Sequence, residues 1–253
     1  MNFEERIKRL IKEIPKGQTL TCLELAIRVG DQKAYQVVEN VLKNNKDSDL
    51  PCHRVVESFK SLGKYNRDVL DKAHLLYTEG YNFPYKKVLG KDFFNRKTKD
   101  VAKDLIGKWL VTKDNALIIT EVEVYAGNND LASHASKGKT QRTKVMFGPA
   151  GIWYVYLIYG MYHMLNIVTE EKGFPAAILI RGTFSVSGPG RLTKKLSIDK
   201  TFNKKPANKK TGLWIEDRGI ELDPSSIKAL KRIGVDYAKN WKDKLLRFKY
   251  IKK

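Results

Sequence analysis

Cysteine and histidine are both scarce in this chain of 253 residues, which contains two Cys and four His. Two cysteines exclude a scaffold held together by disulfides and favour a reducing compartment inside the cell. The few histidines argue against a His-rich metal site, and we expect neither a metal nor a cofactor. Long apolar runs are absent too, because no stretch reaches the roughly 18–20 residues that a membrane span needs. We therefore expect no membrane partner.

Acidic side chains are also in deficit, since 28 Asp and Glu stand against 48 Lys and Arg and leave a formal charge of +20. The excess is uneven, because residues 1–90 carry 16 basic and 12 acidic side chains, whereas residues 91–253 carry 32 and 16. Such an excess indicates a polyanionic partner, although a solvated lysine-rich surface would also explain it. We expect a nucleic-acid-binding protein, cytoplasmic or nucleoid-associated, that attracts phosphate mainly through its second part.

The first part of the chain is predicted to be helical. Apolar periodicity predicts helices over residues 1–14, 22–30, 32–44 and 68–78, with Thr21 and Glu24 at capping-box spacing. The second and third helices are separated by a tight turn at Gly30, which makes a helix-turn-helix candidate. An ordinary helical pair is the other interpretation. The helical period is lost over residues 81–90, which places a domain boundary at residue 88.

The second part, residues 89–253, is predicted to be rich in strands. After a helix over residues 98–106 come strands over residues 109–112, 116–126, 152–158, 162–169 and 176–184. Residues 185–218 are rich in Gly, Pro, Lys and Asn and are predicted to form a long loop with one short helix near residues 192–196. The sequence thus predicts an α+β protein of two domains, 1–88 and 89–253.

The strand over residues 116–126 carries two carboxylates. Alternation along a strand places Glu121, Glu123 and Tyr125 on one face. One interpretation is a solvated outer face of a sheet, which needs no function. The other is a carboxylate that activates water beside a stacking aromatic ring. The pattern alone does not decide between the two.

Tyrosines are concentrated in the segment YVYLIYGMY, residues 154–162. Tyr154 and Tyr156 share a strand face, whereas Tyr159 breaks the alternation and stands beside Gly160, where a hairpin tip is expected. An aromatic ring at a hairpin tip is poorly buried, which suggests that it inserts into a partner. Burial of these rings in a sheet core is the alternative.

Several motifs of the second part occur together and in order: Glu123-x-Tyr125, LASH at residues 131–134, MFGPAG at 146–151, YVYLIYGMYHMLNIV at 154–168, Arg181, and SGPGRL at 187–192. Together these residues resemble the alkyladenine (3-methyladenine) DNA glycosylase family from about residue 90 to 250. The resemblance implies a monofunctional enzyme that flips an alkylated or deaminated purine out of duplex DNA and hydrolyses its N-glycosidic bond. It further implies a curved antiparallel sheet in a mixed α/β domain.

The resemblance also implies a role for individual residues. Glu123 would deprotonate the attacking water, and Tyr159 would fill the gap that the flipped nucleotide leaves in the stack. No role falls to Glu121. The residues that would enclose the base are Tyr125, His134, Tyr156 and Asn166.

Basic residues near the same site would contact phosphate or water. Arg181 is implied to bind water or phosphate beside Glu123. Gly188-Pro189-Gly190 opens a short predicted helix that contains Arg191 and Lys194, a combination that suits a phosphate, although a plain turn is the alternative. A pair of carboxylates as in sugar hydrolases would need both Glu121 and Glu123, and a carbohydrate cleft would not explain the positive charge.

The first part carries a second signal, Pro51-Cys52-His53-Arg54. A Cys beside a His is usually a buried thiol and a surface imidazole. The sequence has no pair of cysteines at the spacing of zinc ligands, which argues against a zinc site. With Asn45, Gly63-x-Tyr65 and Glu79, the segment resembles the O6-alkylguanine-DNA alkyltransferase family over residues 1–86, and so implies a winged-helix fold. The implied roles are Cys52 as alkyl acceptor, His53 as base through a water, Glu79 orienting His53, and Asn45 and Tyr65 binding the base.

Three positions depart from the pattern of the alkyltransferases. The arginine that displaces the flipped base in that family aligns with Gln36. The family's tyrosine in the first helix, which stacks on a base or contacts phosphate, aligns with Cys22, and a small residue of its recognition helix aligns with Glu39. The sequence therefore leaves two interpretations of residues 1–88, an alkyltransferase or a domain that only binds DNA. A non-catalytic architectural DNA-binding protein and an RNA-binding protein are the other classes considered. We expect a monomer.

Overall fold

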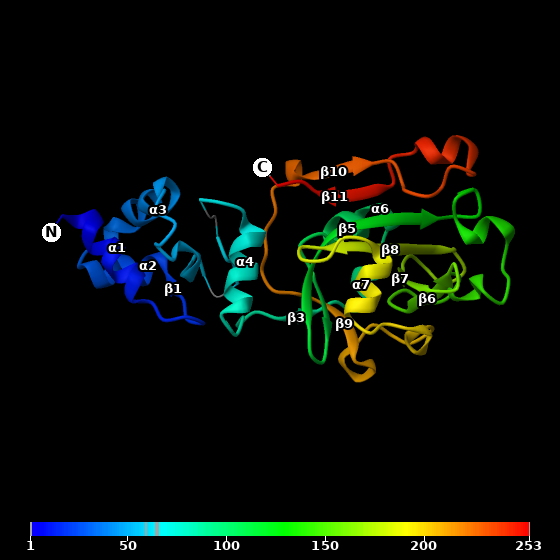
Figure 1. Cartoon of the computed structure of the whole chain (residues 1–253), viewed down its shortest axis with the longest axis horizontal. Coiled ribbons are helices and arrows are strands. Elements are labelled where there is room, and N and C mark those ends of the chain that lie inside the picture. The colour runs from blue at the N-terminus through cyan, green and yellow to red at the C-terminus, as the bar shows by residue number, and fades with distance from the viewer. Residues whose placement is uncertain (1, 59, 64–65, 253) are drawn as a thin grey trace. The chain divides into compact units, whose positions relative to one another are not determined.

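The computed structural model describes residues 2–58, 60–63 and 66–252. The chain divides into two compact units, drawn mainly in blue to cyan and in green to red in Figure 1. Unit 1 holds the chain up to residue 86 together with residues 218–222, and unit 2 holds residues 87–217 and 223–252. Within the described ranges, no helix is long and apolar enough to cross a membrane.

Unit 1 is mainly helical. Its α-helices are α1 (Phe3–Glu13), α2 (Cys22–Val29), α3 (Tyr35–Asn44) and α4 (Val69–Thr78). The predicted capping box is confirmed, because the Thr21 side chain accepts from the Glu24 N–H while Glu24 accepts from the Thr21 N–H. Helix α2 ends at Gly30 with φ of 98°, and the helix pair α2–α3 packs on α1.

Strands contribute little to unit 1. The two-residue strand β1 (Leu20–Thr21) pairs in parallel with β2 (Val55–Val56). The predicted hairpin around Gly63 and Tyr65 includes residues 64–65, which lie outside the described residues. The helical pair is therefore observed, and the wing of a winged helix stays a prediction.

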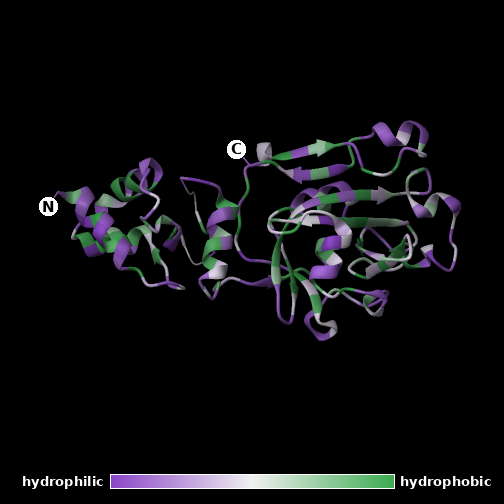
Figure 2. Cartoon of the chain, in the orientation of Figure 1, coloured by the Kyte–Doolittle hydropathy of each residue, from purple (hydrophilic) through white to green (hydrophobic). Residues whose placement is uncertain are grey.

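Unit 2 is built on an antiparallel sheet with strand order β3-β9-β4-β5-β8-β7-β6. The bounds are β3 Lys87–Val88, β4 Trp109–Thr112, β5 Ala116–Ala126, β6 Trp153–Ile158, β7 Tyr162–Val168, β8 Ala176–Thr183 and β9 Leu213–Asp217. Strand β11 (Arg247–Tyr250) pairs with β5 beyond the end of β4 and with β10 (Ile227–Leu230). In Figure 2 the hydrophobic colour lies mainly along the inner strands.

Short helices cover this sheet. Helix α5 (Lys91–Phe94) leads into α6 (Thr98–Leu105), which packs on β5 and β8, while α7 (Pro189–Lys195) packs on β7 and β8. Buried Val101, Leu105 and Leu192 supply the apolar contacts. The central strands β5 and β8 are thus fixed by helices as well as by neighbouring strands.

Strand β5 is interrupted by a bulge. Its register with β8 shifts on both sides of Glu121, which pairs with Gly182, and returns to regular alternation from Val122 onward. Glu121 and Glu123 are 6% and 0% exposed, so the solvated-face interpretation is wrong. Both carboxylates are held inside the protein, where a charge needs partners.

The predicted long loop over residues 185–218 is wrong at its end. Residues 213–217 form β9, an inner strand between β3 and β4, in which Leu213 and Ile215 are fully buried. Residues 203–212 have the composition of a loop, so the short apolar alternation that follows them, Leu213 and Ile215, was assigned to the same loop. Strands β3, β10 and β11, of two to four residues each, were also not predicted.

Candidate active site

A pocket of about 640 Å³ opens in unit 2. It is lined by strands β5, β6, β7 and β8 and by three connecting segments, residues 132–134, 188–191 and 233–237. Most residues expected to act on a base lie together in its lining: Glu123, Tyr125, His134, Tyr156, Tyr159, Asn166, Arg181 and Arg191. Lys194 follows on α7 but does not line the pocket.

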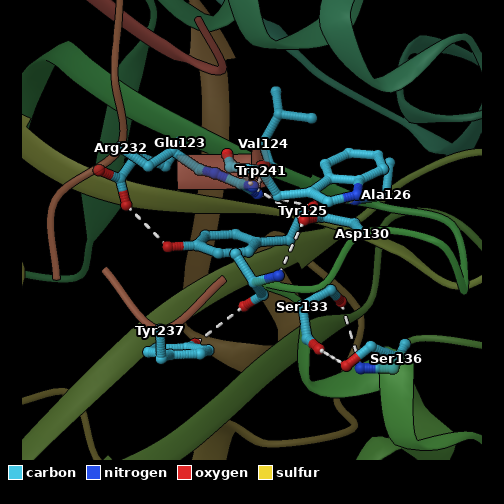
Figure 3. A network of polar contacts seen from close by, with 12 residues as sticks. Glu123, Val124, Tyr125, Ala126, Asp130, Ser133, Ser136, Arg232, Tyr237 and Trp241 are labelled. Carbon is cyan, nitrogen blue, oxygen red and sulfur yellow. Dashed lines mark hydrogen bonds and ion pairs between the residues drawn. The ribbon is translucent and has the colours of Figure 1, made fainter. Parts of the chain in front are cut away.

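Glu123 is a fully buried carboxylate at the pocket wall. The Tyr125 hydroxyl donates to its Oε2 at 2.8 Å, as Figure 3 shows, and the Ile233 N–H donates to its Oε1 at 2.8 Å. Burial raises the pKa of Glu123, although the Arg181 charge and these two hydrogen bonds oppose the shift. A carboxylate with a raised pKa that faces a cavity is suited to taking a proton from water.

Arg181 lies between the two carboxylates of β5. Its Nη1 is 3.5 Å from Glu123 Oε2, and its Nε donates to Glu121 Oε1 at 3.2 Å. Glu121 also accepts from Arg247 Nη1 at 2.9 Å and lies 3.8 Å from Lys249 Nζ. No role was predicted for Glu121, but its hydrogen bonds and ion pairs hold Arg181 beside Glu123.

Aromatic rings form one side of the pocket. His134 and Tyr156 meet edge to face with 4.7 Å between ring centroids, and Tyr154 and Tyr156 lie 5.1 Å apart. Tyr154 is 2% exposed and was predicted only as a strand residue, yet its hydroxyl is 3.1 Å from His134 Nδ1. Such a cluster presents ring faces on which a planar base can stack.

Asn166 lies on β7 opposite Tyr154 and is 3% exposed. Its Nδ2 donates to the Tyr154 carbonyl at 3.1 Å and to the Met164 carbonyl at 3.2 Å. These two bonds fix the orientation of the amide, so the pocket wall at this point is rigid.

The turn between β6 and β7 carries the predicted exposed ring. Tyr159 is 83% exposed and has φ of 52°, followed by Gly160 with φ of 69°, and Met161 is 65% exposed. A tyrosine with positive φ is strained, and this one gains no burial in return. The hairpin tip is confirmed, and its apolar side chains stand at the pocket mouth in position to contact a partner.

Replacing Tyr159 by Ser is expected to weaken binding to lesion-containing duplex by roughly 1–3 kcal/mol, because one ring that stacks on bases is lost. Binding to intact duplex, which depends on charge, should stay unchanged. Fluorescence anisotropy with damaged and intact duplexes at several salt concentrations measures both. An equal loss on the two duplexes would instead mark Tyr159 as a residue needed for folding.

The first turn of α7 and its N-cap, Gly188, also reach the pocket. Gly188, Pro189, Gly190 and Arg191 line it, and a Cβ on Gly190 would lie 2.7 Å from the Tyr162 ring. Glycine is therefore required at position 190 because the backbone passes directly against that ring.

Sequence reasoning missed the C-terminal segment that completes the pocket. Arg232 and Asp130 form a fully buried ion pair with N–O distances of 2.6 and 2.8 Å. Arg232 also donates to the Val124 carbonyl at 2.8 Å and lies 4.8 Å from the centroid of the Tyr125 ring (Figure 3). This contact holds the segment against β5 and thereby brings the Ile233 N–H to Glu123.

Tyr237 is a second exposed ring of this segment. It lines the pocket, is 69% exposed, and donates from its hydroxyl to the Ala132 carbonyl at 3.2 Å, as Figure 3 shows. Residues 231–245 have a mixed, basic composition, and no pattern in them indicated a pocket wall.

Unit 1 brings together part of its predicted site. His53 Nε2 lies 3.0 Å from Glu79 Oε1, and Arg54 donates to both Glu79 oxygens at 3.0 and 2.7 Å. Burial opposes the charge of Glu79, but the hydrogen bonds from Arg54 and His53 outweigh it and lower the pKa of Glu79 to about 2. The carboxylate therefore contacts His53, and it also binds Arg54, for which no role was predicted.

Replacing Glu79 by Gln is expected to destabilise unit 1 by up to about 3 kcal/mol, because the folded-state pKa lies below the unfolded value. Since the pKa is depressed, the stabilisation is present above about pH 4.5 and is lost as the pH falls through about 2. Hydrogen exchange of backbone amides in α1 and α4 checks this across that pH range. As a control, Glu13→Gln removes an exposed carboxylate and should change the free energy of opening measured by hydrogen exchange by less than about 1 kcal/mol. Equal protection in Glu79→Gln and wild type would contradict the prediction.

Cys52 is 2% exposed, and burial raises the pKa of its thiol to about 11. The charge of Lys72 and a hydrogen bond from Asn45 act in the opposite direction. Lys72 is itself 1% exposed, its Nζ donates to the Leu62 carbonyl at 2.5 Å, and burial lowers its pKa to about 8. Sequence analysis did not single out Lys72 as a site residue, yet it is a cation close enough to act on this thiol.

Beyond the Asn45 contact with Cys52, the other residues singled out in unit 1 make local contacts. Asn45 also pairs with the backbone of Asp47, and Gln36 donates to Glu39 on the same helix at 3.3 Å. Cys22 is buried, which raises the pKa of its thiol to about 11. Tyr65 lies outside the described residues.

Comparison with known proteins divides the chain in the same two parts. Residues 92–186 and 184–253 match the family model described as methylpurine-DNA glycosylase. Residues 2–81 match the model described as 6-O-methylguanine DNA methyltransferase, DNA binding domain.

Individual relatives resemble unit 2. A protein of Sodalis glossinidius named "Putative 3-methyladenine DNA glycosylase" is 48% identical over 169 residues, which cover 64% of this chain and 96% of that protein. A protein of the same name from Rickettsia peacockii is 48% identical over 167 residues, or 63% of this chain and 88% of the relative.

Among solved structures, the alkyltransferase OGT of Mycobacterium tuberculosis in complex with DNA is similar to 32% of this chain, with 28% identity and a TM-score of 0.30. The chain spans about half of that protein, 49% of its length.

Proposed function

This chain belongs to the methylpurine-DNA glycosylase family, and we propose that unit 2 hydrolyses the N-glycosidic bond of an alkylated or deaminated purine in duplex DNA. The observation that carries this proposal is Glu123, a fully buried carboxylate with a raised pKa that faces a pocket lined by aromatic rings. The formal charge of +20 supports a DNA substrate, because lysines and arginines that contact phosphate release counterions. We further propose that the chain acts as a monomer.

The reaction begins with a flipped nucleotide. The enzyme rotates the damaged nucleotide out of the duplex, which costs a few kcal/mol of stacking, and the exposed Tyr159 ring fills the gap. Tyr125, His134 and Tyr156 then enclose the base. The rigid amide of Asn166 rejects normal purines by contact with their exocyclic groups.

Hydrolysis follows at the sugar. Glu123 accepts a proton from a water molecule, and the water oxygen forms a bond to C1′ of the deoxyribose as the bond from C1′ to the purine nitrogen breaks. The electron pair of the broken bond leaves with the base. A cationic alkylated purine thereby becomes neutral, whereas a neutral purine also takes up a proton from solvent. Arg181 binds the water or a neighbouring phosphate beside Glu123. The products are a free base and an abasic site, and the strand stays intact.

Incubation with duplexes that contain 3-methyladenine, hypoxanthine or ethenoadenine, followed by alkali, tests this proposal. Alkali cleaves at abasic sites, so strand breaks that appear only after alkali and only at the lesion are the expected result. An architectural DNA-binding protein would bind these duplexes and release no base. Breaks that appear before alkali would mean that the enzyme also cleaves the strand.

For unit 1 we propose transfer of an alkyl group from O6-alkylguanine in DNA to Cys52. The Cys52 thiol would give its proton through a water to His53, the sulfur would bond to the alkyl carbon as the carbon–oxygen bond breaks, and the released guanine would take up a proton from solvent. The hydrogen bond between His53 and Glu79 supports this role. The raised pKa of the Cys52 thiol favours the second candidate, a domain that only binds DNA.

A further inference from the structure

Arg142 lies outside the pocket lining but touches two of its rings. Its guanidinium carbon is 4.9 Å from the centroid of the Tyr156 ring, and its Nη2 is 3.4 Å from His134 Nε2. It also hydrogen-bonds to the Tyr154 side chain. Within the described ranges, no carboxylate forms an ion pair with Arg142, so its charge is not neutralised locally.

These contacts determine where the proton of His134 sits. A guanidinium only donates hydrogen bonds, so its contact with His134 Nε2 favours the tautomer in which Nε2 is unprotonated and accepts. The ring proton is then on Nδ1, which donates to the Tyr154 hydroxyl at 3.1 Å. A second proton on Nε2 would place two cations in contact and remove the hydrogen bond.

We propose that Arg142 is a positioning residue that fixes the proton of His134 on Nδ1 and, together with burial, keeps this ring neutral, so that the stacking wall does not gain a second cation when a positively charged purine binds. The inference rests on the proposed function of unit 2 and concerns the charge of the substrate. Purines alkylated at a ring nitrogen are fixed cations, whereas hypoxanthine and ethenoadenine are neutral. An imidazolium in the stacking wall would repel the cations and leave neutral bases almost unaffected.

The surroundings of His134 agree with this assignment. The charged groups that face it are Arg142 and Lys137, and the titratable groups are Tyr154 and Tyr156 of β6. Burial, and after it the charges of Arg142 and Lys137, lower the pKa of His134 to about 4. The imidazole therefore stays neutral well below the ordinary value of 6.5, and loss of Arg142 raises its pKa toward that value.

The other stacking ring offers an internal comparison. Tyr125 also has a guanidinium against its ring, that of Arg232 at 4.8 Å, but both nitrogens at the end of Arg232 bind Asp130. The charge of Arg232 is thus compensated, while that of Arg142 acts on the pocket. Arg142 is exposed, so its replacement leaves the core intact.

The decisive measurement is a ratio of excision rates in Arg142→Met and wild type. Single-turnover rate constants are measured for 3-methyladenine, a cation, and for ethenoadenine, a neutral base, at about pH 7.5 and about pH 5.5. A neutral base takes up a proton as it leaves, so this ratio depends on pH, but that dependence and the titration of Glu123 are common to both proteins and cancel when the ratio of Arg142→Met is divided by that of wild type. We expect this quotient to fall about twofold or more between about pH 7.5 and about pH 5.5.

Lys144→Met is the matched control, because Lys144 is a nearby basic residue that bonds Gln141. It should behave like wild type. Arg142→Lys retains the charge and should preserve most of the wild-type ratio. A ratio in Arg142→Met that follows wild type at both pH values would overturn the proposal.

An NMR titration of the His134 imidazole tests the same inference without any activity. The His134 signal is assigned by its loss in His134→Gln, and its pKa is compared in wild type and Arg142→Met. We expect a higher value in the variant, and equal values would refute the role of Arg142. If no lesion is excised by wild type, the proposed function fails, but the titration still decides whether Arg142 controls His134.

Discussion

Replacing Glu123 by Gln is expected to lower excision by about 10²-fold or more, because an amide cannot accept a proton from water. Gln has nearly the same shape and can still accept from the Ile233 N–H, so the pocket should keep its structure and bind lesion DNA with unchanged affinity. Single-turnover release of hypoxanthine, together with anisotropy titrations of the same duplex, separates the chemical step from binding.

Glu121→Gln is the control for this prediction. Glu121 is also buried on β5, but it does not line the pocket and bonds Arg181, Arg247 and Lys249 instead. Its replacement removes part of the ion pairing that positions Arg181 and should lower the excision rate about tenfold. Normal excision by Glu123→Gln together with an inactive Glu121→Gln would show that the base has been assigned to the wrong carboxylate.

Replacing Cys52 by Ala is expected to abolish methyl transfer from O6-methylguanine, because the proposed acceptor atom is removed. Wild-type protein should acquire one methyl group slowly, since the thiol pKa is raised to about 11 and Gln36 cannot supply the charge of an arginine. Gln36→Arg should therefore accelerate the transfer. Mass spectrometry of the intact and digested protein after incubation with methylated DNA locates the adduct.

Two further variants make the result on Cys52 unambiguous. Cys22→Ala removes the other thiol and should leave the adduct on Cys52 unchanged, whereas Glu123→Gln should leave methyl transfer unchanged. If wild-type protein with active unit 2 shows no adduct after hours with excess substrate, residues 1–88 only bind DNA.

Strands with complete local signals were predictable. Strand β5 has the predicted bounds Ala116–Ala126 because apolar alternation fills the run and turn-forming Asn115 and Gly127 stand at its two ends. The exposed Tyr159 was predictable for a similar reason, since Gly160 marks a turn where a large ring cannot be buried. The proximity of Glu123 and Tyr125 follows from their spacing of two along one strand.

Contacts between distant segments were not predictable. The Arg232–Asp130 pair joins residues 102 positions apart, and neither residue stands in a pattern that indicates a partner. The Ile233 contact with Glu123 uses a backbone N–H, which every residue except proline possesses. The bulge at Glu121 belongs to the pairing with β8, so the sequence of β5 alone could not reveal why that carboxylate is buried.

The ion pair between Arg232 and Asp130 has a consequence for folding during biosynthesis. A chain is made from its N-terminus, and domains tend to fold in that order. In unit 1, residues 52–54 and 79 come from the early part of the chain, so the His53–Glu79 contact can form while the ribosome is still translating unit 2. The pocket around Glu123 must wait for residues 232–237, and β5 gains β11 only when residues 247–250 leave the ribosome. A nascent or prematurely terminated chain that ends before Arg232 would therefore carry the cysteine site without a complete base pocket.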